Sequence, residues 1–436
     1  MAPPPSPLAV LPLTAIIRSL MTTTISSSPV LLGPSMAVMS AMAHSTNPIL
    51  NPDRNPILKY FLKKTFYAQY CAGENEPEVR RTVSSLKQIG FSGVILGYAR
   101  EVVLTPAQTA DLASCTAEGQ AADECIRNEI NPWARGTLET VRLADEGDFV
   151  ALKFTGAGRQ ALYTLSKRLP PSPALAEAID SVCRLAAERG VRLLFDAEQQ
   201  AVQAGIDDWT VEYMRRFNSG GRAVVYGTYQ AYLKAAPEIL SRHLAVARRE
   251  GFALGVKLVR GAYLGSDPRH LIHDTKADTD AAYDGIAAAL LRGSWSGPLV
   301  RPEGIASDDQ FPCVSLVLAS HNRESVLKAR AIIDAGQSVT EVAFAQLQGM
   351  ADEVSCELVA PTSTPATAGQ KNEKSLVPNR LKAYKYLVWG STGECMKYLL
   401  RRAHENRDAV ERTRSGRDAM RAELWRRLRG VFGLST

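Results

Sequence analysis

Eight short apolar segments alternate along the chain with amphipathic helical segments, and no strand of opposite sense interrupts them. This pattern predicts an α/β protein of the (β/α)8 barrel class, because successive parallel strands need a helical crossover between them. The 436 residues, 45% of them hydrophobic, allow one barrel of roughly 250 residues plus extensions. The expected strands are 91–98, 150–155, 191–195, 223–228, 255–259, 313–319, 342–347 and 384–389.

The segment before the barrel divides into two parts. Residues 1–45 contain no Asp or Glu, are rich in Ser, Thr, Pro and Ala, and have Arg18 as their only strong positive charge. This composition predicts a mitochondrial transit peptide, with a disordered tail as the alternative. Residues 46–90 have helical periodicity and are expected to form a helical arm. No apolar run long enough to span a bilayer follows, so any membrane contact is expected to be peripheral.

The expected barrel covers residues 91–407. Three polar or Pro- and Gly-rich segments interrupt its pattern, near 105–131, 294–310 and 361–377, and are interpreted as insertions. Residues 408–436 predict a basic C-terminal helix with an apolar stripe. Such a helix is typical of membrane-surface or partner docking, and equally of a solvated helix packed on a barrel.

Charge and cysteine content exclude several classes of protein. A net charge of +6 and a pI near 8.9 suit an anionic substrate, flavin phosphates or an anionic membrane, but no basic block is long enough to predict nucleic-acid binding. The seven cysteines are scattered without CxxC spacing, which argues against a disulfide framework. His270 and His273 lack acidic or thiol neighbours, so no metal site is predicted.

Polar residues recur at the carboxyl ends of the expected strands, where barrel enzymes place their catalytic groups. A buried charge is costly unless it is paired, so these residues are interpreted as one shared polar site. They are Lys153, Asp196, Glu198, Gln230, Arg260, Tyr263, His321, Asn322, Gln346, Gln348 and Tyr386.

The last strand leads into a turn and a helix with an unusual polar face. Ser391 or Thr392 is expected to cap this helix. Arg401, Arg402 and Glu405 follow on one side of it, where adjacent guanidinium groups suit bidentate binding of a carboxylate. An ordinary solvated helix face is the alternative for such a pattern.

Several motifs together resemble one family. They are FDAEQQ (195–200), VVYGTYQAYLK (224–234), GVKLVRGAYL (255–264), LASHN (318–322), FAQLQGM (344–350) and the closing YKYLVWGSTGECMKYLLRRAHEN (384–406). In this order the chain resembles the proline dehydrogenase (proline oxidase) family, and within it the fungal-like, mitochondrial branch of eukaryotes. The resemblance extends over residues 60–406.

The resemblance implies an activity and its partners. It implies FAD-dependent oxidation of L-proline to 1-pyrroline-5-carboxylate, with hydride transfer from proline C5 to flavin N5. The electrons would pass to a quinone at the matrix side of the inner mitochondrial membrane, which the enzyme would contact peripherally. The last barrel helix would lie over the barrel mouth.

The resemblance also assigns roles to individual residues. Lys153, Arg401 and Arg402 would hold the substrate carboxylate, with Glu405 behind them. Asp196, Tyr263, Leu347 and Tyr386 would enclose the pyrrolidine ring. Lys257 would lie near flavin N5 and N1, where a positive charge stabilises the reduced ring, or would be a structural lysine. The expected flavin-binding set is Gln230, Lys257, Val259, Gly261, Lys276, Ser320, His321 and Gln346.

Two other enzyme classes fit parts of the chain. The motif GAGRQA (156–161) follows an expected strand and nearly matches a dinucleotide-binding fingerprint, which would indicate an NAD-linked oxidoreductase. Against it, Pro170, Pro171 and Pro173 follow instead, and no acidic residue ends a second strand at the required distance. Lys153 or Lys257 could instead form a Schiff base in a barrel aldolase, provided that its pKa were lowered.

Overall fold

In the computed structural model, the described residues are 6–45, 47–99, 112–115, 119–302, 310–360, 381–408 and 410–431. The side chains of residues 29, 44, 401, 402, 404–408 and 410–412 lie outside that description. The chain divides into two compact units. The central unit is Val94–Phe344, and the terminal unit combines Met1–Gly93 with Ala345–Thr436.

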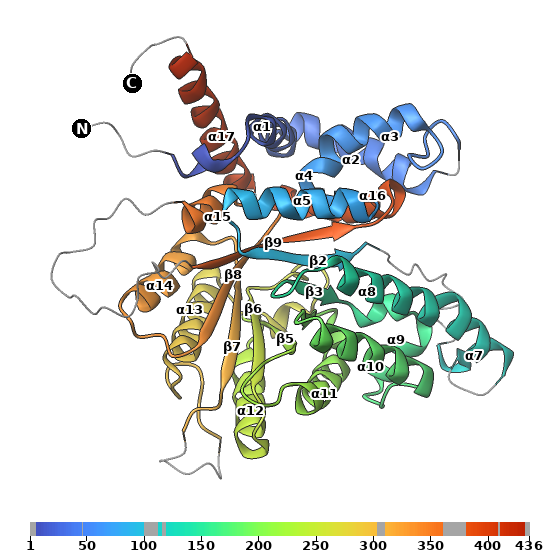
Figure 1. Cartoon of the computed structure of the whole chain (residues 1–436), viewed down its shortest axis with the longest axis vertical. Helices are drawn as coiled ribbons and strands as arrows, with labels where there is room; N and C mark the ends of the chain where they lie inside the picture. The colour runs from blue at the N-terminus through green and yellow to red at the C-terminus, as the bar shows by residue number, and fades with distance from the viewer. Residues whose placement is uncertain are drawn as a thin grey trace. The chain divides into compact units, whose positions relative to one another are not determined.

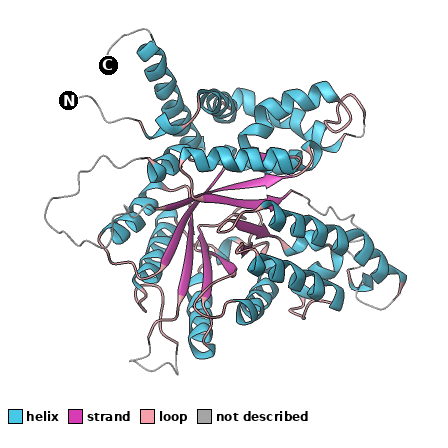
Figure 2. Cartoon of the chain, in the orientation of Figure 1, coloured by secondary structure: helices cyan, strands magenta, loops and turns pink. Residues whose placement is uncertain are grey.

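The central unit is built on parallel strands that pair in chain order. Figure 1 labels these strands, and Figure 2 colours the strands magenta and the helices cyan. Val150 of β3 lies opposite Leu193 of β4, and Lys257 of β6 lies opposite Val317 of β7. The strands are almost continuously buried, as expected for parallel strands covered by helices. They are β2 (Gly93–Tyr98), β3 (Phe149–Leu152), β4 (Arg192–Phe195), β5 (Val225–Gln230), β6 (Leu254–Val259), β7 (Val314–Ala319) and the start of β8 (Glu341–Leu347).

Helices return the chain between these strands. In α11, Val202, Ile206, Trp209 and Tyr213 recur at helical spacing and are all buried, so this helix packs one apolar face inward. The helices are α7 (Gln120–Cys125), α8 (Asn131–Leu143), α9 (Arg159–Ser166), α10 (Pro173–Glu188), α11 (Gln200–Phe217), α12 (Ala236–Glu250), α13 (Lys276–Arg292) and α14 (Arg323–Asp334), with a short turn η5 (Phe154–Ala157) after β3.

The terminal unit joins the two ends of the chain. A short strand β1 (Cys71–Gly73) runs parallel to β9 (Lys382–Trp389), with Cys71 opposite Val388. Helix α1 packs on α17, and α2 packs on α16. The helices of this unit are α1 (Leu13–Ser27), α2 (Pro29–His44), α3 (Pro56–Leu62), α4 (Ala68–Tyr70), α5 (Glu76–Ile89), α15 (Asp352–Val359), α16 (Thr392–Asp408) and α17 (Val410–Val431).

The strand order confirms the predicted fold class. The order is β1-β9-β2-β3-β4-β5-β6-β7-β8, and β9 also pairs with β8. Strands β2 to β9 therefore close an eight-stranded barrel, and each expected strand corresponds to one of them. The ninth strand, β1, was missed because three residues are too few to show a periodicity. The placement of α16 over the barrel mouth stays a prediction.

Residues 13–44, which were expected to belong to a leader, form α1 and α2. Within the described residues no single helix is long and apolar enough to cross a bilayer, although α1 and α2 pass that test together as a pair bent by 102°. In the first expected insertion, Cys115 and Cys125 are buried and the second of them ends α7. Residues 105–111, 116–118, 303–309 and 361–377 of the three insertions lie outside the described chain.

Candidate functional site

The carboxyl ends of the central strands carry most of the predicted polar residues. Because the strands are parallel, these ends meet at one edge of the sheet. Lys153 directly follows β3 rather than lying inside it, and Asp196 directly follows β4. Gln230 is the last residue of β5, and Val259 is the last residue of β6. Ser320 and His321 directly follow β7.

Asp196 and Lys257 form a buried ion pair at this edge. Lys257 Nζ lies 2.6 Å from Asp196 Oδ1, and their side chains are only 9% and 8% exposed. Strand β5 separates β4 from β6 in the sheet, so a contact between these two residues requires both side chains to point into the barrel. A carboxylate this close to Lys257 offsets part of the positive charge that was predicted to lie near a flavin.

Glu198 lies two residues after Asp196, beyond the same end of β4. It is 4% exposed, and it accepts hydrogen bonds from the backbone N–H of Thr155 at 3.1 Å and from the Thr155 hydroxyl. Burial raises the pKa of the Glu198 carboxyl, while the ammonium of Lys153 opposes that shift. The indole of Trp133 donates to the Lys153 carbonyl at 3.0 Å, which fixes the backbone from which the Lys153 side chain extends.

Gln230 presents an unsatisfied donor. Its Oε1 accepts from the backbone N–H of Ala262 at 3.0 Å, which fixes the orientation of the amide. Its Nε2 is buried and has no hydrogen-bond partner in the part of the chain that the structure describes. A buried amide donor without a partner is costly, so this atom is suited to an acceptor on a bound ligand.

The segment after β6 packs through Gly261 and Tyr263. A Cβ atom on Gly261 would lie 2.4 Å from the ring of Tyr232, so this glycine is required by an internal aromatic contact rather than by a ligand. The Tyr263 hydroxyl donates to the carbonyl of Ala197 at 3.3 Å. Tyr263 is thereby tied to the residue that follows Asp196, as a shared site requires.

Lys276 lies apart from the buried pair. It is the first residue of α13, its side chain is 76% exposed, and its Nζ lies 2.6 Å from Asp280 Oδ2. Arg260 contacts the same carboxylate and also donates to Ser325 Oγ at 2.7 Å. Arg260, expected in the polar site, is therefore used to tie β6 to α13 and α14, and Asp280 was not predicted.

The residues of the predicted site in the terminal unit lie on β8 and β9. Gln346 and Leu347 end β8, and Tyr386 lies in β9 with its carbonyl accepting from the Gln348 N–H at 2.9 Å. The Gln346 Oε1 accepts from the Ser355 hydroxyl at 3.2 Å. A ligand at Gln346 would therefore share that side chain with α15.

A second buried ion pair in this unit was not predicted. Lys385, next to Tyr386 in β9, is 2% exposed, and its Nζ lies 2.7 Å from Asp352 Oδ1 and 2.8 Å from Ser355 Oγ. The sequence shows a lysine in β9 but does not reveal its partner, because Asp352 lies 33 residues earlier in the chain. The pair attaches β9 to α15.

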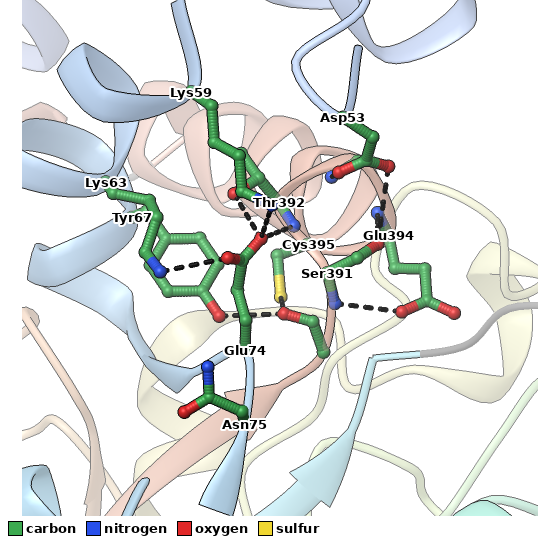
Figure 3. A network of polar contacts seen from close by, with 12 residues as sticks. Asp53, Lys59, Lys63, Tyr67, Glu74, Asn75, Ser391, Thr392, Glu394 and Cys395 are labelled. Atoms are coloured by element: carbon green, nitrogen blue, oxygen red, sulfur yellow. Dashed lines mark hydrogen bonds and ion pairs between the residues drawn. The ribbon is translucent and has the colours of Figure 1, made fainter. Parts of the chain in front are cut away.

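Helix α16, which carries Arg401, Arg402 and Glu405, is held at its first turn (Figure 3). Ser391 Oγ accepts from the Glu394 N–H at 3.2 Å, and Glu394 Oε2 accepts from the Ser391 N–H at 3.0 Å. This reciprocal pair is a capping box, which makes Ser391 the N-cap. The Gly393 N–H donates to Asp53 Oδ1 at 3.0 Å.

Glu74 binds the remaining N–H of that turn. It accepts from the Thr392 N–H and the Thr392 hydroxyl, both at 2.7 Å, and lies 3.0 Å from Lys59 Nζ and 2.9 Å from Lys63 Nζ (Figure 3). Burial alone would raise the pKa of Glu74, but hydrogen bonds from Lys63, Thr392 and Lys59 outweigh it and lower the pKa to about 2. The side chains of Arg401, Arg402 and Glu405 lie outside the described chain.

The dinucleotide-binding alternative fails at the helix that it would use. The carboxylate of Glu129 accepts from the Arg159 N–H at 2.6 Å and from Arg159 Nε at 2.7 Å, at the N-terminus of α9. Gly158 has φ +90°, and a Cβ there would lie 2.0 Å from Glu129 Oε2. The glycine and the helix N-terminus thus already hold an internal carboxylate, where the fingerprint would place a pyrophosphate.

Comparison with known proteins agrees with the barrel and its motifs. The sequence model of the family described as proline dehydrogenase matches residues 79–415. The chain belongs to the proline dehydrogenase family. These proteins are oxidoreductases, so the chain is placed among enzymes of that class.

Curated relatives match over most of their length. The chain is 30% identical over 419 residues to the probable mitochondrial proline dehydrogenase of Schizosaccharomyces pombe, covering 86% of this chain and 81% of the relative. It is also 30% identical over 412 residues to the hydroxyproline dehydrogenase of Homo sapiens, covering 84% of this chain and 82% of that protein.

Solved structures share the fold. Proline utilization A of Bdellovibrio bacteriovorus, inactivated by N-propargylglycine, matches with a TM-score of 0.63 at 17% identity. The match covers 89% of this chain and only 38% of that larger protein. At this identity the likeness establishes the barrel fold and nothing about the reaction.

Replacing Asp196 with Asn is expected to destabilise the protein by about 3 kcal/mol, because it leaves Lys257 buried without its partner. Adding Lys257→Met should recover most of that loss, since the uncompensated charge is then gone. Urea unfolding of the single and double variants measures both effects. The control is Asp208→Asn, which breaks an exposed pair with Arg168 and should cost less than about 1 kcal/mol. Additive losses in the double variant would contradict the pairing.

Glu74→Gln is expected to lower the free energy of unfolding at pH 7 by about 1–3 kcal/mol, because charge-assisted hydrogen bonds to two lysines and to α16 are weakened. The folded pKa lies below the usual 4.5, so the contribution of the charge is present above pH 4.5 and is lost as pH falls toward 2. The difference between variant and wild type should therefore shrink on acidification.

The matched control is Glu76→Gln, two residues along the chain at the start of α5. Glu76 pairs with Arg80 across a half-exposed surface, so this variant should cost about 0.5 kcal/mol or less at both pH values. Equal losses for Glu74→Gln and Glu76→Gln would contradict the anchoring role of Glu74.

Proposed function

We propose that this enzyme oxidises L-proline to 1-pyrroline-5-carboxylate with FAD as its cofactor. The observation that carries the proposal is the polar site at the carboxyl ends of β3 to β6, where Lys153, the Asp196–Lys257 pair and the unpartnered donor of Gln230 occur in a barrel of the proline dehydrogenase family. A bound flavin supplies a hydride acceptor, which no protein side chain can provide.

The residues of the chain would bind and orient the substrate. Lys153, Arg401 and Arg402 would hold the carboxylate of proline, with Glu405 orienting the arginines. Asp196, Tyr263, Leu347 and Tyr386 would enclose the ring. A carboxylate fixed by Lys257 can accept a hydrogen bond from the substrate nitrogen, and two fixed ends of the substrate hold C5 in one position for reaction.

The residues present also fit a flavin. The Nε2 of Gln230 is a fixed donor that lacks a partner in the described chain, and a flavin ring offers carbonyl and nitrogen acceptors. Lys257 lies within β6, and Val259, Ser320, His321 and Gln346 lie at or directly beside strand ends; all five would line the same ligand. Gly261 and Lys276 are weaker members of this set, because Gly261 serves the packing of Tyr232 and Lys276 is exposed and paired with Asp280.

The names of the relatives support a mitochondrial location. Matching relatives from S. pombe, Caenorhabditis elegans and Dictyostelium discoideum are named as mitochondrial proline dehydrogenases. We infer a mitochondrial enzyme, peripheral to the matrix side of the inner membrane, that passes its electrons to a quinone.

The purified protein is expected to be yellow, and anaerobic L-proline should bleach its flavin absorption because the bound ring becomes reduced. Absorption spectra before and after proline addition test this. Hydroxyproline, added in parallel, should bleach more slowly if proline is the preferred substrate. A colourless protein whose proline oxidation requires added NAD would overturn the proposal.

Arg401→Ala and Arg402→Ala are each expected to reduce kcat/KM for proline by about ten- to a hundredfold or more, since each removes charge-assisted hydrogen bonds of roughly 1.5–3 kcal/mol. Lysine at either position should rescue only part of the loss, because it keeps the charge without the planar fork. Steady-state kinetics and flavin content measure the effect, and flavin content should stay near that of wild type.

The control is Arg249→Ala, an arginine with a 70% exposed side chain on α12, which should leave kcat/KM unchanged. An inhibitor that retains the ring and lacks the carboxylate should bind wild type and both arginine variants alike. Unchanged kinetics in both variants would remove α16 from substrate binding.

A further inference from the structure

The N-terminal segment is part of the folded core of the terminal unit. Ile16 of α1 is fully buried and Leu8 is 2% exposed, and both pack in a cluster with Cys356 of α15 and Met420 of α17. Removing residues 1–45 would take away Leu8 and Ile16 and uncover the side chains of Cys356 and Met420. The segment therefore behaves as a structural element rather than as a tail.

Polar contacts hold the same segment to α17. The guanidinium of Arg427 donates to the carbonyls of Leu8, Ala9 and Leu11 at 3.3, 3.2 and 2.8 Å. Its other edge binds Glu423, whose side chain is fully buried, at 2.7 Å. Arg417 also reaches Ser27 Oγ at 3.2 Å. Without residues 8–27, Arg427 would lose these three carbonyl acceptors and Arg417 would lose the Ser27 hydroxyl.

The outer side of the segment is apolar and exposed. Of the seventeen exposed large hydrophobic side chains in the described chain, ten lie between Leu13 and Phe61. Helix α2 contains no Asp, Glu, Lys or Arg, yet its Val30, Leu31 and Val38 are 79%, 46% and 58% exposed. Exposed apolar residues are ordinary when single, but concentration in one segment marks an interaction surface.

Helix α3 continues this surface along the chain. Ile57, Tyr60 and Phe61 lie at i, i+3 and i+4, so they share one face, and they are 82%, 67% and 60% exposed. Lys64, which is also exposed, places its ammonium 5.8 Å from the Tyr60 ring centroid. Aromatic and aliphatic side chains beside a lysine are typical of a helix that lies in a membrane interface.

The charge of the N-terminal segment and of α17 favours an anionic partner. No Asp or Glu occurs before Asp53, so an anionic surface meets no carboxylate in the first 52 residues. The outer side of α17 adds exposed Arg421, Arg426 and Arg429 with Trp425 and Leu428. A lipid surface of negative charge complements both the apolar and the basic side chains.

We propose that α1 and α2 remain in the mature enzyme and that the exposed apolar faces of α2 and α3 dock on an anionic phospholipid membrane. This proposal rests on the peripheral membrane location in the proposed function and assigns it to a surface. Cleavage of a leader that ended before residue 7 is compatible with it, and removal of residues 1–45 is not.

Flotation of the full-length enzyme with phosphatidylcholine vesicles, with and without cardiolipin, tests the surface. Cardiolipin should increase the bound fraction, and added salt should reduce it. Val30→Ser, Leu31→Ser and Val38→Ser combined with Ile57→Ser, Tyr60→Ser and Phe61→Ser should weaken binding at least about tenfold, because apolar area no longer enters the interface. The control Val300→Ser with Val339→Ser, also exposed but in the central unit, should bind as wild type does.

Three outcomes would overturn the proposal. The first is unchanged vesicle binding in the six-fold variant. The second is a wild-type protein that does not bind vesicles but forms a dimer, which the six substitutions convert to a monomer. The third is a protein lacking residues 1–45 that keeps both its melting temperature and its vesicle binding. Proline oxidation with a soluble dye as acceptor should be equal in all the substitution variants. If the wild-type protein does not oxidise proline with the dye, the proposed function is contradicted, and the vesicle-binding result is unaffected.

Discussion

The hydrogen bonds at the N-terminus of α16 are the constraint on which the rest of the terminal unit depends. A helix begins with N–H groups that have no partner within the helix, and here Glu74, Asp53 and Ser391 accept three of them. Glu74 is itself held between Lys59 and Lys63. Residues more than 300 positions apart in the chain thus fix the start of the helix that carries both candidate substrate arginines.

In the central unit, the polar site is held by a buried ion pair instead of by helix capping. Asp196 and Lys257 face each other across β5, inside the barrel, and Glu198 is held by Thr155. Polar groups in such an interior are costly unless each has a partner. The Nε2 of Gln230, at the end of β5, has no partner among the described residues, and a bound ligand can provide one.

The barrel and most of the polar site were predictable from sequence because apolar periodicity and motif order are local signals. The strand ends were less certain, and Lys153 proved to follow β3 rather than lie within it. Long-range partners left no local trace. Neither the Lys385–Asp352 pair nor the role of Glu74 could be inferred, since each joins segments brought together only by the fold. The internal partner of the GAGRQA motif was hidden for the same reason, because Glu129, which binds the N-terminus of that helix, lies 30 residues from Arg159.

The packing of the first helix on the last one has a practical consequence for work with fragments. A recombinant fragment cut at the limits of the family match, residues 79–415, would contain the whole barrel signature. It would lack Asp53, Lys59, Lys63 and Glu74, and with them the partners of the first turn of α16. It would also lose α1 together with most of α17, two helices that pack on each other. A fragment defined by the limits of the family match alone would therefore be too short for soluble expression.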